Sequence, residues 1–326
     1  MDAAASLTPQ ALLHRLEWRV VRRLDGLLQG DYRTLFRGAG IDFTDLREYA
    51  PGDDLRHVDW NVTARMDTPY VREYVEDREV TAWLLLDHSA SMGFGPVDRQ
   101  KDLVLAEVAT TLAHVLSRGG NRVGMMLLGD GPGVIDEVIP PAGGRRQVLR
   151  IAGTLLAHRA ARAERTASAD RTTGRGKTAR PPGGTTDLGA LLRAANAVVR
   201  RRSLLVLVSD FISCPGWERP LAQLTQRHDV VAIRVVDPRE SELPSVGMVY
   251  VEDAETGEQI FVDTSDPAFR ARLLEAARTR DEALLAATRA AGVSLHRVGT
   301  DEDLVRALVR VSALRARAAT SRRAAG

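Results

Sequence analysis

Cysteine is almost absent from this chain of 326 residues, which has one, at position 214. A single cysteine excludes an internal disulfide and is typical of a reducing compartment. Cys214 has no obvious base beside it in the sequence, so we expect an inert thiol rather than a nucleophile. Aromatic residues make up only 5% of the chain while 44% of it is hydrophobic, so a substantial core would be mainly aliphatic.

Long apolar runs and a strong charge of one sign are also missing. No run approaches the roughly 18 residues of a membrane-spanning helix, and the N-terminus lacks the order of a signal peptide. A net charge of +2 indicates neither nucleic acid nor an acidic surface as a partner. The sequence has no G-x-x-x-x-G-K-[ST] loop for binding a nucleotide. We therefore expect a cytoplasmic protein with no membrane span and no nucleic-acid partner.

The stretch 82–95, AWLLLDHSASMGFG, combines a buried strand with a group of oxygen ligands. Its apolar run, residues 83–86, predicts a strand buried on both faces. Asp87, Ser89 and Ser91 follow, and in an extended backbone their side chains point the same way. Because open α/β sheets bind ligands at the carboxyl ends of strands, these oxygens predict a site for Mg²⁺, with Mn²⁺ or Ca²⁺ possible, rather than Zn²⁺. The alternative is that they only cap the following helix.

Two later stretches extend this group of oxygen ligands. Residues 183–187, GGTTD, form a Gly-rich turn before an amphipathic helix. Residues 203–208, SLLVLV, predict a second buried strand, which also leads into an acid, Asp210. Two such aspartates and a threonine loop are the pattern of a site with five oxygen ligands. Asp187 is expected to cap the helix that follows it rather than to bind a metal.

These motifs resemble the von Willebrand factor A (vWA) domain and its metal-ion-dependent adhesion site. The resemblance extends from residue 80 to about residue 311. The matching ligand positions are Asp87, Ser89, Ser91, Thr185 (with Thr186 as the alternative) and Asp210. The resemblance implies a mostly parallel central sheet flanked by helices. It also implies Mg²⁺ held by these side chains, directly or through water, with one coordination position open for a carboxylate from a partner protein.

Residues 37–79 are rich in charged and aromatic side chains and predict a small β-rich lobe. This lobe resembles the bacterial "domain of unknown function 58" family, in which the same signature directly precedes a vWA domain. The signature residues are Asp42-Phe43, Leu46-Arg47-Glu48-Tyr49, Gly52-Asp53, Arg56, Asp59-Trp60 and Ala64-Arg65. The resemblance implies a MoxR-type AAA+ ATPase as partner and a chaperone-like role in assembling or activating other proteins.

The polar residues of this lobe have two interpretations. Ion-pair networks are usually scaffolding, which here would fix the lobe against the vWA-like sheet. The functional interpretation is a surface that binds a partner, because Trp, Tyr and Arg dominate binding hot spots. The residues that it would use are Arg47, Tyr49, Trp60 and Arg65.

The chain divides into three expected parts. Residues 1–79 hold an N-terminal helix and the β-rich lobe, residues 80–312 the vWA-like domain, and residues 313–326 a flexible tail. Residues 159–182 contain almost no large apolar side chain and are rich in arginine, so they predict a mobile loop near the metal face. That loop would be a surface insertion or, alternatively, a segment that gates the site or grasps a partner.

The expected function is therefore a Mg²⁺-dependent protein-interaction adaptor without enzymatic activity. A metal-dependent hydrolase of the phosphoesterase type is the main alternative, but it needs a positioned nucleophile and base. His88 stands between two ligand positions and should point away from the metal. A basic nucleic-acid-binding protein is a weaker alternative, and it predicts an affinity that falls steeply with salt.

Overall fold

The chain forms two compact units, which we describe separately. The computed structural model describes residues 8–17, 45–50, 53, 58–66, 68–73, 80–95, 99–131, 133–172, 186–252 and 259–311. The small unit is Arg37–Val80, and the large unit combines Met1–Phe36 with Thr81–Gly326. The unit boundary lies within two residues of the one that the sequence predicts. The N-terminal helix, however, belongs to the large unit and not, as predicted, with the lobe.

A six-stranded sheet forms the centre of the large unit, in the order β10-β7-β6-β3-β4-β5. Its strands are β3 (Thr81–Asp87), β4 (Arg122–Leu128), β5 (Ile135–Ala142), β6 (Leu204–Ser209), β7 (Asp229–Val236) and β10 (Ser294–Gly299). All neighbouring pairs are parallel except β4 and β5. The chain runs from β3 outward to β4 and β5, and then returns to the other side of β3 with β6. The strand order therefore reverses between β3 and β6.

The central strands form because they are continuous aliphatic runs buried on both faces. Every residue of β6 is buried, as is every residue of β3 after Thr81. On one face, Trp83 and Leu85 pack with Leu205 and Leu207 against helix side chains such as Leu191. Each fully buried leucine contributes about 2 kcal/mol through the hydrophobic effect. These two strands are thus held firmly at the centre of the sheet.

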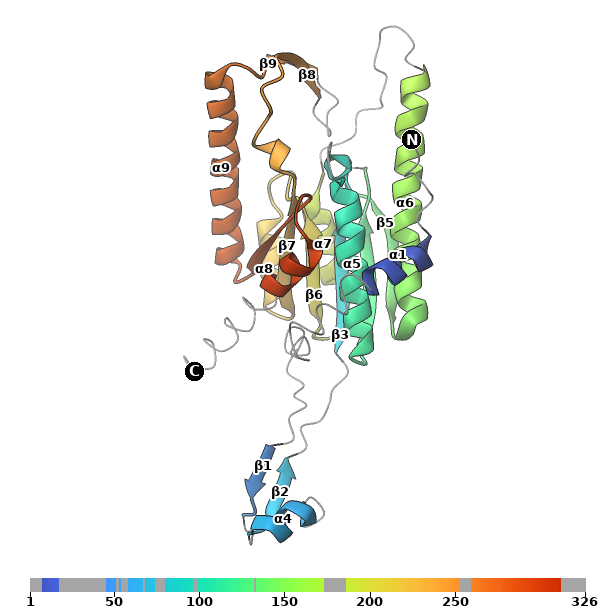
Figure 1. The fold of residues 1–326 in the computed structure, drawn as a ribbon, viewed down its shortest axis with the longest axis vertical. Helices are drawn as coiled ribbons and strands as arrows, with labels where there is room; N and C mark the ends of the chain where they lie inside the picture. The colour runs from blue at the N-terminus through green and yellow to red at the C-terminus, as the bar shows by residue number, and fades with distance from the viewer. Residues whose placement is uncertain are drawn as a thin grey trace. The chain divides into compact units, whose positions relative to one another are not determined.

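Helices cover the sheet, which gives the mixed α/β class that the sequence predicts and is consistent with a vWA-like fold. The α-helices of this unit among the described residues include α1 (Pro9–Leu16), α5 (Lys101–Arg118), α6 (Gly144–Thr172), α7 (Leu188–Val198), α8 (Glu218–Thr225) and α9 (Pro267–Ala290). Residues 304–311 are also helical. In Figure 1, α9 and α6 stand at opposite sides of the sheet. None of the helices in the described part of the chain is both long and apolar enough to cross a membrane.

Helix α6 corrects one expectation from the sequence. The predicted mobile loop was to begin at residue 159, but α6 continues without a break to Thr172. Alanine, arginine and glutamate have high helix propensity, so a segment poor in large apolar residues can still be helical. Ion pairs also tie the helix down, because Arg159 contacts Asp102 at 3.0 Å and Arg162 contacts Asp130 at 2.7 Å. Residues 173–185, where the rest of the predicted loop falls, lie outside the described residues.

The small unit is less purely β than predicted. Its strands β1 (Asp45–Glu48) and β2 (Tyr70–Glu73) pair antiparallel. Between them lies helix α4 (Trp60–Met66), which the sequence analysis did not predict. Asp59 begins this helix, accepting a hydrogen bond from the Val62 backbone N–H at 3.3 Å. Asp59 therefore has a structural role within the lobe, as the N-cap of α4.

An antiparallel pair, β8 (Met248–Glu252) and β9 (Gln259–Asp263), completes the described strands. The following α9 starts with Asp266 as N-cap and Pro267 in the first turn, where proline is favoured.

Candidate metal centre

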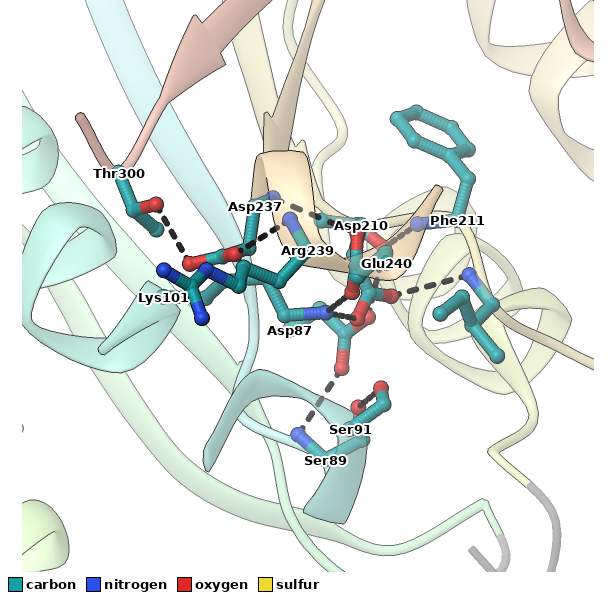
Figure 2. A network of polar contacts seen from close by, with 12 residues as sticks. Asp87, Ser89, Ser91, Lys101, Asp210, Phe211, Asp237, Arg239, Glu240 and Thr300 are labelled. Atoms are coloured by element: carbon teal, nitrogen blue, oxygen red, sulfur yellow. Dashed lines mark hydrogen bonds and ion pairs between the residues drawn. The ribbon is translucent and has the colours of Figure 1, made fainter. Parts of the chain in front are cut away.

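The predicted ligands gather where the strand order of the sheet reverses. Asp87 is the last residue of β3, and Asp210 directly follows the neighbouring strand β6. The reversal point at the carboxyl ends of the strands is where open α/β sheets bind ligands. The fold therefore brings these two aspartates, which are 123 positions apart in the sequence, to one place (Figure 2).

The Asp87 carboxylate is fixed by hydroxyl and backbone donors. Ser209 Oγ donates to Asp87 Oδ2 at 2.6 Å, and the Ser89 N–H donates to Asp87 Oδ1 at 3.0 Å. The hydroxyls of Ser89 and Ser91 lie 3.1 Å apart. A short 3₁₀ helix, η3 (Ala90–Gly93), follows, and the Ser89 side chain makes no capping hydrogen bond to it. The capping alternative is thus wrong for Ser89, and the hydroxyls of the two serines are gathered beside a carboxylate.

Burial gives Asp87 an unusual charge state. Its pKa is raised from 3.8 to about 7, first by burial and then by the negative charge of Asp210. The hydrogen bonds from Ser209 and Ser89 act in the opposite direction and lower it. No lysine or arginine of the described residues forms an ion pair with Asp87. The carboxylate therefore lies in an environment that favours either a proton or a cation.

Asp210 is held differently, because a lysine neutralises it. Lys101, the first residue of α5, is fully buried, and its ammonium donates to Asp210 Oδ2 at 2.6 Å. The same ammonium donates to Glu240 Oε1 (Figure 2). Burial opposes the charge of Lys101, but the two carboxylates outweigh it and raise its pKa. Lys101 is therefore a permanent cation inside the candidate site.

Neither Lys101 nor Glu240 was predicted as a site residue, although the sequence holds one signal for Lys101. The apolar stripe of α5 includes Leu105 and Val108, and Lys101 precedes them by four and seven residues. That spacing places Lys101 on the buried face of the helix. A lysine buried at that position needs a carboxylate beside it to balance its charge. For Glu240, which lies in a turn after β7, we find no equivalent signal.

The turn after β7 positions Glu240. Asp237 accepts a hydrogen bond from the Arg239 N–H at 2.8 Å, and Glu240 Oε2 accepts one from the Asp237 N–H at 3.4 Å. This reciprocal capping box begins the short helix η4 (Pro238–Glu240). Thr300, after β10, donates to Asp237 Oδ2 at 2.6 Å. Asp237 therefore acts as a turn residue that fixes the position of Glu240.

Backbone strain follows the Asp210 position. Phe211 has a φ of +61°, a left-handed conformation that is uncommon for a residue other than glycine. Its N–H donates to Ser209 Oγ at 2.8 Å, and the Ile212 N–H donates to Asp210 Oδ1 at 2.9 Å. The bond from Ile212 fixes the orientation of the Asp210 carboxylate. The Ser209 hydroxyl links the Phe211 backbone to the Asp87 carboxylate.

The threonine position falls partly outside the described residues. Thr185, the predicted ligand, lies in the segment that is not described. Thr186 is buried, and its carbonyl accepts hydrogen bonds from Ser213 Oγ and the Cys214 N–H, both at 2.9 Å. Asp187 caps α7 through the Ala190 N–H at 3.0 Å, which confirms its predicted structural role. The threonine segment is thus attached to the loop that carries Asp210.

His88 points away from the aspartates, as predicted. Arg162 of α6 lies 2.9 Å from His88 Nδ1, and it also donates to the His88 carbonyl and to Asp130. Burial first, and then the positive charge of Arg162, lower the His88 pKa to about 2. The imidazole is therefore neutral and turned toward α6.

The residues present fit a divalent cation in part. Asp87 and the two serine hydroxyls are hard oxygen donors, which suit Mg²⁺, Mn²⁺ or Ca²⁺. In the described part of the chain, no three His, Cys, Asp or Glu residues form a group that could hold a metal, so hydroxyls must contribute. Asp210 does not fit a metal ligand as it stands, because both of its carboxylate oxygens already accept hydrogen bonds. Lys101 donates to Oδ2, and the Ile212 N–H donates to Oδ1.

The predicted partner-binding residues lie in the small unit. Trp60 is 69% exposed, Arg65 is exposed and Tyr49 is half-buried. Arg47 lies in β1, and its side chain is outside what the structure describes. The exposed tryptophan at the start of α4 is the feature of this unit that a packed scaffold does not explain.

Comparison with known proteins identifies relatives over nearly the whole chain. It is 35% identical over 309 residues to uncharacterized proteins of Mycobacterium bovis and Mycobacterium tuberculosis, covering 95% of this chain and 90% of each relative. Among solved structures it is similar to a conserved hypothetical protein, BatB from Bacteroides thetaiotaomicron. That match has a TM-score of 0.40 and 15% identity, and covers 73% of this chain and 99% of the other. The family described as protein of unknown function DUF58 matches residues 45–283, and the chain therefore belongs to the DUF58 family.

Proposed function

We propose that this protein is a Mg²⁺-dependent protein-interaction adaptor. The observation that carries the proposal is Asp87, a fully buried carboxylate without an ion-pair partner in the described part of the chain, beside the hydroxyls of Ser89 and Ser91. A buried carboxylate is costly unless a cation or a proton neutralises it. A divalent ion would supply that charge and bind the hydroxyl oxygens at the same time.

The proposed ligands are those that the sequence predicts. Asp87, Ser89 and Ser91 would hold the ion, with Thr185 beside them and Asp210 bound directly or through water. Mn²⁺ and Ca²⁺ are alternatives to Mg²⁺, because all three bind hard oxygen donors. When bound, the ion supplies an open coordination position for an aspartate or glutamate of a partner protein. The chain's own residues would fix the orientation of that position.

The proposed partner is a MoxR-type AAA+ ATPase in the cytoplasm, and the proposed role is chaperone-like assembly or activation of other proteins. This part of the proposal rests on the family resemblance. The exposed Trp60 and Arg65, with Tyr49 and Arg47, are candidates for a second contact surface, because Trp, Tyr and Arg are enriched in binding hot spots.

The hydrolase alternative gains no support from the site. A general base must lie within hydrogen-bond reach of the reacting group. His88 is held neutral and contacts Arg162 instead. Lys101 is charged and engaged by two carboxylates, so it is not placed to act as a base.

The experiment is capture of the AAA+ ATPase by the immobilised full-length protein, in Mg²⁺ and in EDTA. We expect capture by the wild type in Mg²⁺ and a loss of at least about tenfold in EDTA or with Asp87→Asn, because removing a metal ligand removes the bridging ion. Glu275→Gln, which changes an exposed carboxylate on α9, is the matched control and should capture normally.

Thermal melting of each variant separates loss of binding from loss of fold. The proposal would be refuted if a folded Asp87→Asn variant captured the ATPase as well as the wild type does, both in Mg²⁺ and in EDTA. Raising the salt concentration tests the nucleic-acid alternative, because nucleic-acid affinity falls by orders of magnitude between low and moderate salt.

A further inference from the structure

Lys101 places a cation inside the site where the proposed function requires a divalent one. The side chain is fully buried, and its ammonium bridges Asp210 and Glu240. Figure 2 shows the ammonium bound to these two carboxylates, and the Asp210 carboxylate in turn lies near enough to Asp87 for its negative charge to act on it. The cluster thus holds three carboxylates and one ammonium. With all three acids ionised, its net charge is −2, which one divalent ion would balance.

The two hydrogen bonds of Asp210 differ in how readily they can be given up. The Ile212 N–H that binds Oδ1 belongs to the backbone of a strained loop and cannot leave without moving that loop. The ammonium that binds Oδ2 is at the end of a flexible four-carbon chain. Lys101 is therefore the partner of Asp210 that an incoming cation can replace.

Glu240 gives the displaced ammonium a place to stay. Its Oε1 already accepts a hydrogen bond from Lys101, and its Oε2 accepts one from the Asp237 N–H of the capping box. A lysine that lost Asp210 would still be paired. Without Glu240, the lysine would depend on Asp210 alone and would hold it more strongly, because an unpaired buried charge is costly.

Lys101 is also linked to the loop of the serine ligands. Its backbone N–H donates to the Phe94 carbonyl at 2.8 Å, and its ammonium lies 5.9 Å from the centre of the Phe94 ring. Phe94 directly follows η3, the short helix that contains Ser91. The start of α5, which carries Lys101, is therefore hydrogen-bonded to the segment that directly follows the serine ligands.

We propose that Lys101 is a resident cation that competes with the divalent ion for Asp210, and that Glu240 retains the ammonium when the divalent ion binds. The site is then folded with or without metal, and its metal affinity is set by the lysine–carboxylate pair. This inference rests on the proposed metal site at Asp87 and adds how that site is regulated.

The test is titration of the metal-free full-length protein with MnCl₂, with free Mn²⁺ measured by electron paramagnetic resonance. Lys101→Met should bind Mn²⁺ at least about tenfold more tightly than the wild type, because it removes the positive charge that now occupies Asp210 Oδ2. Glu240→Gln should bind at least about tenfold more weakly. Arg122→Met removes a positive charge at the amino end of β4, the opposite end of that strand from the site, and should leave the affinity within about threefold of the wild type.

The double variant Lys101→Met/Glu240→Gln keeps the net charge of the cluster and tests the proposal if the single lysine variant does not fold. It should bind Mn²⁺ within about threefold of the wild type. A folded Lys101→Met that binds no more tightly than the wild type overturns the proposal, and so does a double variant that binds at least about tenfold more weakly.

These outcomes separate the inference from the proposed function. If the wild type binds Mn²⁺, Asp87→Asn does not, and Lys101→Met gains nothing, only the role of Lys101 is refuted. If Lys101→Met binds more tightly but capture of the ATPase ignores the metal, the lysine competes as proposed and the adaptor function fails. If no variant binds Mn²⁺ at millimolar concentration, both are refuted.

Discussion

At the scale of single residues, Asp87 is the group whose charge the fold changes most clearly. Its pKa rises to about 7 on folding, mainly through burial. A raised carboxyl pKa means that the folded protein holds a proton that the unfolded chain releases above about pH 4. In EDTA, the free energy of unfolding should therefore fall as the pH rises from about 4 to about 7, and the contribution of Asp87 should level off above that range.

Urea unfolding at a series of pH values, in EDTA, measures this dependence. Asp87→Asn cannot titrate, so its stability should be flatter over the same range. An equal slope in the wild type and in Asp87→Asn would show that other groups cause the pH dependence. Saturating Mg²⁺ should raise the stability of the wild type and flatten this dependence if the ion binds the ionised carboxylate, because the ion then replaces the proton in the folded state.

Ser209 offers a second prediction at this scale. Its hydroxyl donates to Asp87 and accepts from the Phe211 N–H, so it satisfies two buried groups at once. Ser209→Ala should lower the free energy of unfolding by about 1–3 kcal/mol, because it leaves a buried carboxylate oxygen and a backbone N–H without their partner. Ser203→Ala, just before the same strand, is the control, since its hydroxyl bonds locally to the Arg201 carbonyl. Equal losses in urea unfolding would contradict the linking role of Ser209.

Part of the site could be predicted from single residues and part could not. Asp87, Ser89 and Ser91 are visible in the sequence because their spacing of two follows directly after an apolar run, and the structure places them together with Asp210. Lys101 was missed because a charged residue is expected on the solvated face of a helix. Only the spacing of four residues between Lys101 and the buried Leu105 indicates that the lysine lies on the buried face of the helix.

At the scale of elements, α6 shows where composition misleads. Residues 159–172 lack large apolar side chains, which the sequence analysis interpreted as a mobile loop, whereas the structure has a helix there. The two central strands, at residues 83–86 and 203–208, were predicted because burial on both faces imposes a continuous apolar run. The second half of α6 has no such pattern, since ion pairs with α5 and with the loop after β4 hold it instead.

Two arginines of α6 provide a matched test of this attachment. Arg162 and Arg165 both contact Asp130 at 2.7 Å, but the side chain of Arg162 is 11% exposed and that of Arg165 is 65% exposed. Arg162→Met should cost about 2–4 kcal/mol, because it also removes the bonds to the His88 carbonyl and ring. Arg165→Met should cost less than about 1 kcal/mol, since solvent screens an exposed pair.

Hydrogen exchange adds a local measurement to the unfolding curves of these two variants. Loss of Arg162 should increase exchange at the amides of residues 88–93, because that arginine fixes the segment to α6. Loss of Arg165 should leave those amides unchanged. Similar exchange in the two variants would mean that α6 does not stabilise the loop that carries the serines.

At the scale of the whole molecule, the chain places the charged signature and the metal motifs in different units. The small unit has few buried apolar side chains among its described residues, namely Val58 and Val71, yet it exposes Trp60 and Met66. Large exposed apolar residues grouped with arginine mark surfaces that bind other proteins. The boundary between the units was predictable from the change in composition. The helix α4 that presents Trp60 was not, because its seven residues are too few to show a helical period.

Trp60→Ala should therefore weaken capture of the AAA+ ATPase without weakening the fold. We expect capture to fall at least about fivefold, which corresponds to about 1 kcal/mol, the lower bound for an interface residue that matters. The free energy of unfolding should change by less than about 0.5 kcal/mol, because the side chain is mostly exposed. Capture assays and urea unfolding measure the two quantities on the same preparations.

Tyr250 is the matched control, because it is 72% exposed and lies on β8 of the large unit. Tyr250→Ala removes a comparable aromatic surface, so equal losses in the two variants would indicate nonspecific hydrophobic capture. Combining Trp60→Ala with EDTA then distinguishes one interface from two. If Trp60 and the metal contact the partner independently, their effects on the binding free energy should add within about 0.5 kcal/mol. If EDTA has no further effect on Trp60→Ala, the two features belong to a single coupled interface.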